Sequence, residues 1–430
     1  MAEPSVELTV ERLSKLGEGV AHWDGRAVFI QGGLPGDVLQ VRVTPDGKVL
    51  RGALERVLTP APQRRAPSCA LFERCGGCDW LALTEAGQRE AHQEIVLSAL
   101  ERTAGVARSD LNLLPTRIFP KTLGYRRRAV LHWGPEGLGY FGRRSHRHLA
   151  VESCPILSEP LGVLPGKLSP LLAVISRETA AVHLLSEGAQ VAVALELKGP
   201  VRPKHREAAD RVIRAGLAVG VVLTPKEGSA ELLGRPVLKG FAPLRPDVPL
   251  YFRPDAFSQA HEQGASGLAE AALGLLKVQK DEDVLELYSG NGFFSAALAS
   301  QGKSVVAVEG ASVSCGLAQR SAAEGKLGNL RIIQGDVGKV CEGLVREGRR
   351  FEVMLADPPR TGAPGIAEWA AGLRVKRVLF VACEVEGLVA GARELVARGF
   401  KPSQLQLLEM FPQTRHIEVL LTFFHTAEAR

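Results

Sequence analysis

The stretch that decides the fold is Asp283-Val284-Leu285-Glu286-Leu287-Tyr288-Ser289-Gly290-Asn291-Gly292. Its apolar run predicts a buried strand, and its glycines predict a tight turn before a helix. Because glycine has no side chain, the backbone at Gly290 and Gly292 can approach a ligand closely. Since any tight turn can contain two glycines, the stretch alone indicates a strand–turn–helix unit whose turn is a candidate binding site.

The same rhythm of strand and helix continues toward the C-terminus. Further strands are predicted at 304–309, 331–336, 351–357 and 377–383, with a helix near 312–325. Strands that alternate with helices form a doubly wound α/β sheet, which binds its ligands at the carboxyl ends of the strands. We therefore predict a Rossmann-like α/β domain over residues 256–430.

Acidic residues stand at the ends of three of these strands, namely Glu309, Asp336 and Asp357. A carboxylate at the end of the second strand can accept hydrogen bonds from both hydroxyls of a ribose. For any one of them a solvated loop carboxylate is the simpler interpretation, but suitable groups at consecutive strand ends favour a nucleoside ligand. Residues 293–295 do not continue the G-x-G-x-x-G pattern of a dinucleotide site, which favours S-adenosylmethionine over NAD.

The turn Asp357-Pro358-Pro359-Arg360 sharpens this prediction. Two prolines directly after a buried strand fix an extended turn and remove two amide donors. The turn therefore projects the Asp357 carboxylate into the crevice at the strand ends. A proline-rich loop without a function seldom begins with an acid in that place.

Two regions with other patterns precede this domain. Residues 1–58 contain short alternating runs at 6–10, 27–30 and 38–43, separated by glycines, which predicts a small β-barrel of the OB type. Residues 59–255 begin with a proline-rich linker and are then mixed, with a helix expected at 85–103 and strands at 129–133 and 191–195. We therefore predict three domains, 1–58, 59–255 and 256–430.

Among the seven cysteines, three stand close together: Cys69, Cys75 and Cys78. Three thiols in one glycine-rich loop converge on one centre, and Cys154, which precedes a proline, is a natural fourth ligand. Zinc and a [4Fe-4S] cluster both accept four thiolates, and the spacing does not choose between them. Cys315 and Cys341 fall in predicted helical stretches and are expected in the core.

Positive charge concentrates in the segment 117–148. The basic residues there are Arg117, Lys121, Arg126, Arg127, Arg128, Arg143, Arg144 and Arg147, with only Glu136 opposing them. Aromatic residues are interleaved, a combination suited to phosphate contact and base stacking. A run of charge is usually a solvated face, but the OB-like region before it favours RNA as the partner.

The composition agrees with a soluble globular protein. The 430 residues are 45% hydrophobic and 23% charged, and the formal net charge is +6. No apolar stretch is long enough to cross a bilayer, and the acidic N-terminus lacks the basic region of a signal peptide. We therefore expect a cytoplasmic protein that acts as a monomer and has no membrane partner.

Several motifs resemble those of the uracil-5 RNA methyltransferases, the bacterial family that makes 5-methyluridine in 23S rRNA and tRNA. Residues 17–21 and 34–37 resemble a TRAM domain, and the cysteine loop resembles the family's iron–sulfur loop. Residues 124–129 and 143–146 match the family's central domain. The catalytic domain is matched at residues 257–259, 287–292, 357–362 and 411–418. The resemblance covers nearly the whole chain.

The resemblance implies roles for individual residues. The contacts to S-adenosylmethionine or the target base would come from Gln259, Tyr288, Gly290, Glu309, Asp336 and Asp357. Cys383 would be the nucleophile and Glu418 the base. The resemblance favours iron, in a [4Fe-4S] cluster on Cys69, Cys75, Cys78 and Cys154. The sequence departs from the family at Glu384-Val385, where Asn-Pro is usual, and at His261, where asparagine is usual.

The implied chemistry needs a thiol, a base and a methyl donor. C5 of uracil is a poor nucleophile, but addition of a thiolate to C6 places negative charge on C5 and O4, so that C5 can attack the sulfonium methyl group. A base then removes the C5 proton, and the thiolate leaves. The uridine must leave its stack to react, so a flipped or single-stranded base is expected. From the residues alone, Cys383 can also be a small core residue, although that interpretation fits Cys315 and Cys341 better, and Glu418 is equally a surface strand carboxylate.

We therefore predict methylation of uridine C5 in RNA through a covalent adduct at Cys383. The OB-like region together with the cysteine loop resembles the 23S rRNA branch, and tRNA is the alternative substrate. Two other classes stay open: an RNA-binding protein with an inactive methyltransferase site, and a methyltransferase for cytosine C5 or for protein.

Overall fold

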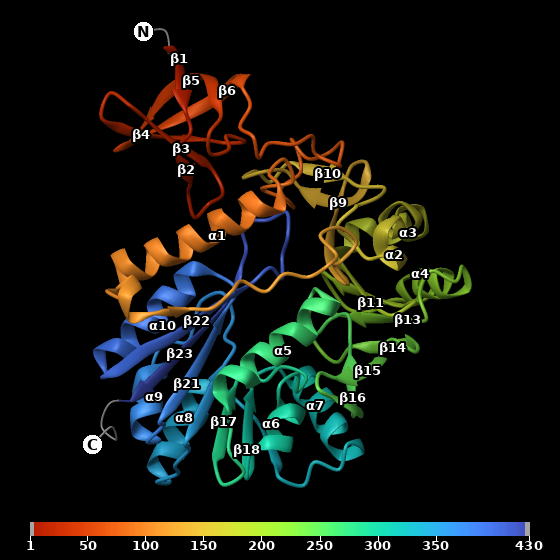
Figure 1. The fold of residues 1–430 in the computed structure, drawn as a ribbon. Coiled ribbons are helices and arrows are strands. Elements are labelled where there is room, and N and C mark those ends of the chain that lie inside the picture. The colour runs from red at the N-terminus through yellow and green to blue at the C-terminus, as the bar shows by residue number, and fades with distance from the viewer. Residues whose placement is uncertain (1–3, 426–430) are drawn as a thin grey trace.

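The computed structural model describes residues 4–425, so the outermost residues of the first and last predicted domains, 1–3 and 426–430, lie outside the described residues. Figure 1 shows a β-rich N-terminal part in red, a central part in yellow and green, and an α/β part from green to blue. Within residues 4–425, no helix combines the length and the apolar character needed to cross a membrane.

The N-terminal sheet has six short strands in the order β1-β5-β6-β4-β3-β2. They are β1 (Ser5–Thr9), β2 (Arg12–Leu13), β3 (Gly19–Trp23), β4 (Arg26–Ile30), β5 (Val38–Asp46) and β6 (Val49–Thr59). Alternate side chains such as Val28, Ile30 and Leu39 face inward and are fully buried. Gly52 is required where β6 crosses this core, because a Cβ there would lie 2.5 Å from Val41 Cγ1. The strands predicted at 6–10, 27–30 and 38–43 are confirmed as β1, β4 and β5.

The central sheet has seven strands in the order β10-β9-β8-β11-β12-β13-β14. They are β8 (Arg128–Gly134), β9 (Gly137–Phe141), β10 (His148–Ala150), β11 (Thr179–Glu187), β12 (Gln190–Leu197), β13 (Gly220–Thr224) and β14 (Glu231–Gly234). The helices α2 (Glu159–Gly162), α3 (Leu164–Leu172) and α4 (Pro203–Arg214) accompany it, and α3 and α4 share its core through Leu168 and Val212. A hairpin of β15 (Leu238–Ala242) and β16 (Arg245–Phe252) follows.

The C-terminal sheet has eight strands in the order β19-β18-β17-β20-β21-β23-β22-β7. They are β17 (Asp283–Leu287), β18 (Ser304–Glu309), β19 (Leu330–Gln334), β20 (Val353–Ala356), β21 (Arg377–Ala382), β22 (Phe400–Leu408), β23 (Glu418–His425) and β7 (Asn112–Leu113). Strands β17 to β21 run parallel, and β23 is inserted antiparallel between β21 and β22. This order brings the ends of β17, β18, β20 and β21 to one edge, where the start of β23 also lies.

Helices cover both faces of this sheet, as the doubly wound pattern predicts. They are α5 (Glu262–Leu276), α6 (Ser295–Gln301), α7 (Ser312–Glu324), α8 (Val337–Arg346), α9 (Ile366–Gly372) and α10 (Val385–Ala397). One core contains α5 and α6, and the other contains α8, α9 and α10. Cys315 in α7 and Cys341 in α8 are buried, which confirms the prediction that both are core residues.

Helix α1 (Glu85–Ala99) belongs to the α/β body in space although it precedes it in sequence. Thr84 begins it by accepting a hydrogen bond from Gly87 N at 3.3 Å, and a π-helical turn, Leu100–Ala104, ends it. Val96 and Leu100 are buried in the same core as Leu388 of α10, and Figure 1 shows the orange α1 against α10. Together with β7 at the sheet edge, α1 ties the segment 85–113 to the C-terminal sheet.

Candidate active site

The turn after β17 forms the first part of the site. Tyr288, Gly290 and Gly292 have φ values of 61°, 58° and 85°, in the left-handed region. Gly292 N donates to Ser289 O at 3.0 Å, which closes the turn. A Cβ added at Gly290 would have no atom within 4 Å, so this side of the turn is open to a ligand.

The two acidic residues at the next strand ends have different local roles. Glu309 holds the turn, because its Oε2 accepts from Gly290 N at 2.9 Å and its Oε1 accepts from Ala311 N at 2.7 Å. Asp336 caps α8 by accepting from Lys339 N at 3.0 Å. Both carboxylates are therefore fixed at the edge of the sheet, as predicted from their strand-end positions.

Glu286 is a site residue that the sequence reasoning missed. It is fully buried inside β17, and its Oε2 accepts from Ser295 Oγ at 2.6 Å. Burial raises its pKa to about 8, and the charges of Asp357 and Glu309 raise it as well. Its Oε1 and the Ser289 Oγ are both buried with no hydrogen-bond partner among the described residues. The signal that would have identified it in the sequence is an acid inside an otherwise apolar strand.

These orphaned atoms fit a polar ligand. A buried oxygen without a hydrogen bond is costly, so a turn with two of them is suited to a molecule that carries donors. The open face of Gly290 and the fixed carboxylate of Glu309 lie in the same turn. A nucleoside with ribose hydroxyls and an amino group matches this set.

Asp357 lies at the end of β20 and is partly buried. Its backbone N donates to Leu287 O at 3.3 Å, which joins the turn after β20 to the end of β17. Gln259 Nε2 donates to Asp357 Oδ2 at 3.4 Å. Burial raises the pKa of Asp357 to about 7. The two predicted residues Gln259 and Asp357 are thus brought together from positions about a hundred residues apart.

Cys383 and Glu418 face each other across two neighbouring strands. Ala382 of β21 pairs with Val419 of β23, so the next step of that register sets Cys383 opposite Glu418. Burial, and then the charges of Glu418 and Asp357, raise the pKa of the Cys383 thiol to about 12, while Arg360 acts in the opposite direction. Burial and the Asp357 charge also raise the pKa of Glu418 well above its usual range. The Cys383 thiol, the buried carboxyl group of Glu418 and the partly buried carboxyl group of Asp357 therefore lie near one another.

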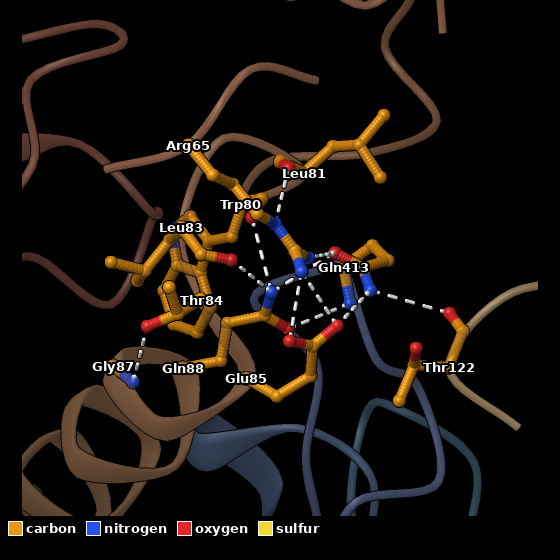
Figure 2. A network of polar contacts seen from close by, with 10 residues as sticks. All are labelled: Arg65, Trp80, Leu81, Leu83, Thr84, Glu85, Gly87, Gln88, Thr122 and Gln413. Atoms are coloured by element: carbon orange, nitrogen blue, oxygen red, sulfur yellow. Dashed lines mark hydrogen bonds and ion pairs between the residues drawn. The ribbon is translucent and has the colours of Figure 1, made fainter. Parts of the chain in front are cut away.

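Gln413 fixes the loop before Glu418 through hydrogen bonds of both its backbone and its side chain, as Figure 2 shows. Gln413 is fully buried and has a φ of 73°. Its N donates to Gln88 Oε1 at 2.8 Å, and its carbonyl oxygen accepts from Asp79 N at 3.1 Å and Trp80 N at 3.0 Å. Helix α1 and the cysteine loop therefore fix the backbone of Gln413.

The Gln413 side chain completes the network. Its Oε1 accepts from Arg65 at 2.8 Å and from Gln88 Nε2 at 3.0 Å. Its Nε2 donates to Glu85 Oε1 and to Thr122 O, each at 3.3 Å. The role of Gln413 is not visible in the sequence, because all these partners lie around three hundred residues away in the chain.

Other contacts hold the same loop from both sides. His92 of α1 contacts Glu409 at 3.1 Å and Thr414 O at 3.2 Å. Arg415 N donates to Asp79 Oδ2 at 3.1 Å, and Tyr125 donates to Pro412 O at 3.1 Å. The segment that carries Glu418 is thus shaped by residues that precede the α/β domain.

His261, one of the departures noted in the sequence, has a structural role. It caps α5 by accepting from Gly264 N at 3.1 Å through Nδ1, and its ring stacks on Tyr125 at 4.8 Å. Burial lowers its pKa to about 4, so the ring is neutral at physiological pH.

The four predicted metal ligands lie in one neighbourhood. Cys69, Cys78 and Cys154 pack on the cluster of Leu81, Tyr125 and Ile156. Burial, and then the thiols of Cys154, Cys75 and Cys69, raise the pKa of Cys78 to about 12. Gly77 N donates to Cys75 Sγ at 3.4 Å. However, in residues 4–425 no three Cys, His, Asp or Glu side chains stand close enough to hold a metal ion, so the arrangement brings the thiols together without showing a metal centre.

The basic segment is only partly a surface for RNA. Arg127 is buried and donates to Gln259 O at 2.8 Å, and burial lowers its pKa. Arg143 donates to Cys78 O at 2.6 Å and to Phe72 O at 3.0 Å, so it holds the cysteine loop. These two residues therefore do not supply the phosphate contacts for which the run is suited, because their guanidinium groups donate to carbonyls inside the protein. Arg144 and Arg147 are exposed.

A groove of ≈ 510 Å³ lies beside Arg143 and Arg144. It is lined by the N-terminal loop at Gly17 and Glu18, by Tyr140 and Phe141 of β9, and by Arg415 of the loop before Glu418. Phe141 is 40% exposed, and its ring stacks on His132 with centroids 4.8 Å apart. The groove therefore joins an exposed aromatic ring to the loop that leads to Glu418.

Comparison with known proteins agrees with this geometry. Residues 250–424 match the family model described as tRNA (Uracil-5-)-methyltransferase, and residues 5–52 match that of the TRAM domain. The chain is 32% identical over 424 residues to a 23S rRNA (uracil(1939)-C(5))-methyltransferase, RlmD, of Pseudomonas putida, with 97% of this chain and 93% of the relative covered. It is 31% identical to the protein of the same name from Aeromonas hydrophila, with 97% and 96% covered.

A solved structure shows the same fold. The tRNA (uracil-54, C5)-methyltransferase of Pyrococcus abyssi, in complex with S-adenosyl-L-homocysteine, superposes with a TM-score of 0.72 at 19% identity, covering 97% of this chain and 100% of that one. The α/β body is therefore the fold of an S-adenosylmethionine-dependent methyltransferase. Together with the near-complete match to the relatives, this shows that the chain belongs to the uracil-5 RNA methyltransferase family.

Proposed function

We propose that this chain methylates C5 of a uridine in 23S rRNA, with Cys383 as covalent nucleophile and S-adenosylmethionine as methyl donor. The observation that carries the proposal is the meeting of Cys383, Glu418 and Asp357 at one edge of the sheet. The relatives named as 23S rRNA methyltransferases support that RNA as the substrate.

The donor would bind over the turn after β17. Gly290 leaves the space, Glu309 offers its fixed carboxylate to the ribose, and Tyr288 and Asp336 flank the opening. Ser289 Oγ and Glu286 Oε1 would find partners there. S-adenosylmethionine supplies an electrophilic methyl group when bound, and Asp357 and Gln259 are positioned to hold the uracil beside it.

In the free protein, the pKa values of Cys383, Asp357 and Glu418 are raised, so these groups hold their protons more strongly than usual. With a pKa of about 12, the Cys383 thiol keeps its proton in the free protein at neutral pH. The Asp357 carboxylate, whose charge acts on Cys383, would accept that proton and return it at the end of the cycle, which leaves Glu418 free for the C5 proton, and Arg360 favours the thiolate once the proton has left. Addition of the sulfur to C6 would then place negative charge on the uracil ring rather than on the buried sulfur.

Glu418 is the group suited to take the C5 proton after methyl transfer. Burial raises its pKa, so the carboxylate is a stronger base than an exposed glutamate. Its removal of the proton from C5 returns the electron pair to the ring and releases the sulfur from C6. Cys383 then regains a proton, and the methylated uridine leaves.

We also propose that Cys69, Cys75, Cys78 and Cys154 hold a [4Fe-4S] cluster. The chemistry of the donor set fits, since four thiols share one partly buried place and a backbone N–H already points at Cys75 Sγ. The role would be structural, because the next residues, Asp79 and Trp80, hold the Gln413 carbonyl.

Protein purified without oxygen is expected to contain about four iron atoms per chain, as a [4Fe-4S] cluster requires. Cys75→Ser should lose most of that iron, because one thiolate ligand is missing. Cys341→Ala removes a buried cysteine of α8 and should keep it. Stoichiometric zinc without iron, or equal iron in both variants, would contradict the assignment.

The proposed substrate is tested by mapping 5-methyluridine with mass spectrometry in RNA from cells that lack the protein. We expect one 5-methyluridine to disappear from 23S rRNA and to return when the intact gene is restored. A loss confined to tRNA would reassign the substrate. Unchanged 5-methyluridine in both RNAs would contradict the proposed function.

A further inference from the structure

Glu384 directly follows Cys383 and stands at the N-cap position of α10. A carboxylate there usually accepts a hydrogen bond from the first turn of its helix, but Glu384 makes no such bond. Its side chain is only 13% exposed. The carboxylate therefore serves partners other than its own helix.

Those partners are three basic side chains from two loops. His416 Nδ1 lies 2.8 Å from Glu384 Oε1, and Arg415 lies 3.6 Å from Oε2. Arg360 Nε lies 3.6 Å from Oε1. Arg360 ends the turn that begins with Asp357, and His416 comes two residues before Glu418.

The charges agree with an ionised carboxylate at the centre. Burial alone would raise the pKa of Glu384, but the hydrogen bond from His416 and the charges of His416, Arg415 and Arg360 outweigh it, and the pKa is lowered. The groups that face Glu384 from the packed elements are basic side chains, apart from the nearby Glu386, whose own partner is Lys15 at 2.9 Å. The carboxylate stays charged at neutral pH.

We propose that Glu384 is a positioning residue that holds the nucleophile strand, the Asp357 turn and the Glu418 loop in one fixed arrangement. Glu384 directly follows Cys383 in the chain. Its side chain contacts the two segments that carry Asp357 and Glu418. The contact to His416 is the shortest, so Glu384 acts on the reaction mainly by setting where Glu418 stands. This rests on the proposed function, because it assigns Glu384 a place in the same reaction.

The test is Glu384→Gln, which keeps the size of the side chain and removes its charge. A small displacement of a catalytic group can lower the rate on the order of a hundredfold, so we expect kcat to fall by about tenfold to a hundredfold. The dissociation constant for S-adenosylmethionine should stay within about twofold, since no cofactor contact changes. Because the base is the displaced group, the fraction of enzyme trapped as a covalent RNA adduct should rise.

Matched variants separate this role from a general loss of charge or stability. Glu386→Gln removes a carboxylate from the first turn of the same helix, which pairs with Lys15, and should leave kcat and the adduct fraction unchanged. Glu384→Asp keeps the charge and should recover part of kcat. In a double-mutant cycle, Glu384→Gln combined with His416→Ala should be no slower than the slower single variant, because both break the same contact.

Two results would overturn the proposal. One is a Glu384→Gln protein with wild-type kcat and no added adduct. The other is fully additive losses in the cycle, since Glu384 would then not act through His416. Both are distinct from failure of the proposed function, in which the wild-type protein itself forms no 5-methyluridine in the same assay. If Glu384→Gln does not fold, as shown by lost S-adenosylmethionine binding, Glu384→Asp and the His416→Ala protein decide the question by the same two measurements.

Discussion

Cys383→Ala is expected to lose 5-methyluridine formation by roughly 10⁴-fold or more, the scale on which removal of a nucleophile usually acts. The reason is that no other group in the described site can add to C6, since Glu418 and Asp357 are carboxyl groups and Cys383 stands opposite Glu418 across β21 and β23. Binding of S-adenosylmethionine should survive, because its proposed contacts lie in the turn after β17 and at the ends of β18 and β19. Radiolabelled methyl transfer and calorimetric binding measure the two separately.

The same variant should fail to form a covalent adduct with RNA that carries 5-fluorouridine at the target. Fluorine replaces the proton that Glu418 would remove, so the methylated adduct of the wild-type protein cannot collapse and is retained on a denaturing gel. Cys341→Ala is the matched control, because it removes a buried cysteine that lies outside the site. Wild-type activity in Cys383→Ala would refute the nucleophile assignment outright.

Glu418→Gln is expected to fail at a later step. A positioned general base contributes about 10²–10⁴-fold, and kcat should fall within that range. Addition of Cys383 and methyl transfer do not need the Glu418 carboxylate to accept the C5 proton, so an adduct with ordinary uridine should accumulate. Removal of the nearby charge should also lower the pKa of Cys383, since Glu418 is one of the groups that raise it.

The pH dependence of kcat in the wild-type protein provides a second test of the role of Glu418. A base acts in its ionised form, and burial raises the pKa of Glu418, so kcat should increase with pH over a range that lies above the one in which an exposed glutamate ionises. Equal, simple losses in Cys383→Ala and Glu418→Gln, with no adduct in either, would indicate a folding defect and would contradict the two assigned roles.

Much of the site was predictable because its parts are local in sequence. The glycine turn at Gly290, the strand-end acids and the proline turn after Asp357 each follow a buried strand, and parallel strands bring their ends to one edge. The structure places Gly290 beside Glu309 and Gln259 beside Asp357 accordingly. The position of Cys383 opposite Glu418 needed more, since it depends on the insertion of β23 between β21 and β22.

The sequence did not predict which charged and polar side chains form hydrogen bonds within the protein and which stay available for a ligand. Arg127 and Arg143 sit in a run of basic residues that looks uniform, yet both donate to buried carbonyls. Gln413 and Glu384 are likewise ordinary polar residues until the fold supplies their partners from distant segments. Periodicity reports which face of an element is apolar, but not which of several polar neighbours a side chain will choose.

The Gln413 network has a consequence for modularity. The α/β body has the appearance of a separate catalytic module. However, the loop that leads to Glu418, the proposed base, is held by hydrogen bonds to Gln88 of α1 and to Asp79 and Trp80 of the cysteine loop. Cutting the chain before residue 256 would remove these partners and the edge strand β7 together. Even if the methyltransferase fold survived such a truncation, the loop that leads to Glu418 would lose the contacts that hold it in place. We therefore expect catalysis by this chain to depend on residues before 256 as well as on the domain that carries Cys383 and Glu418.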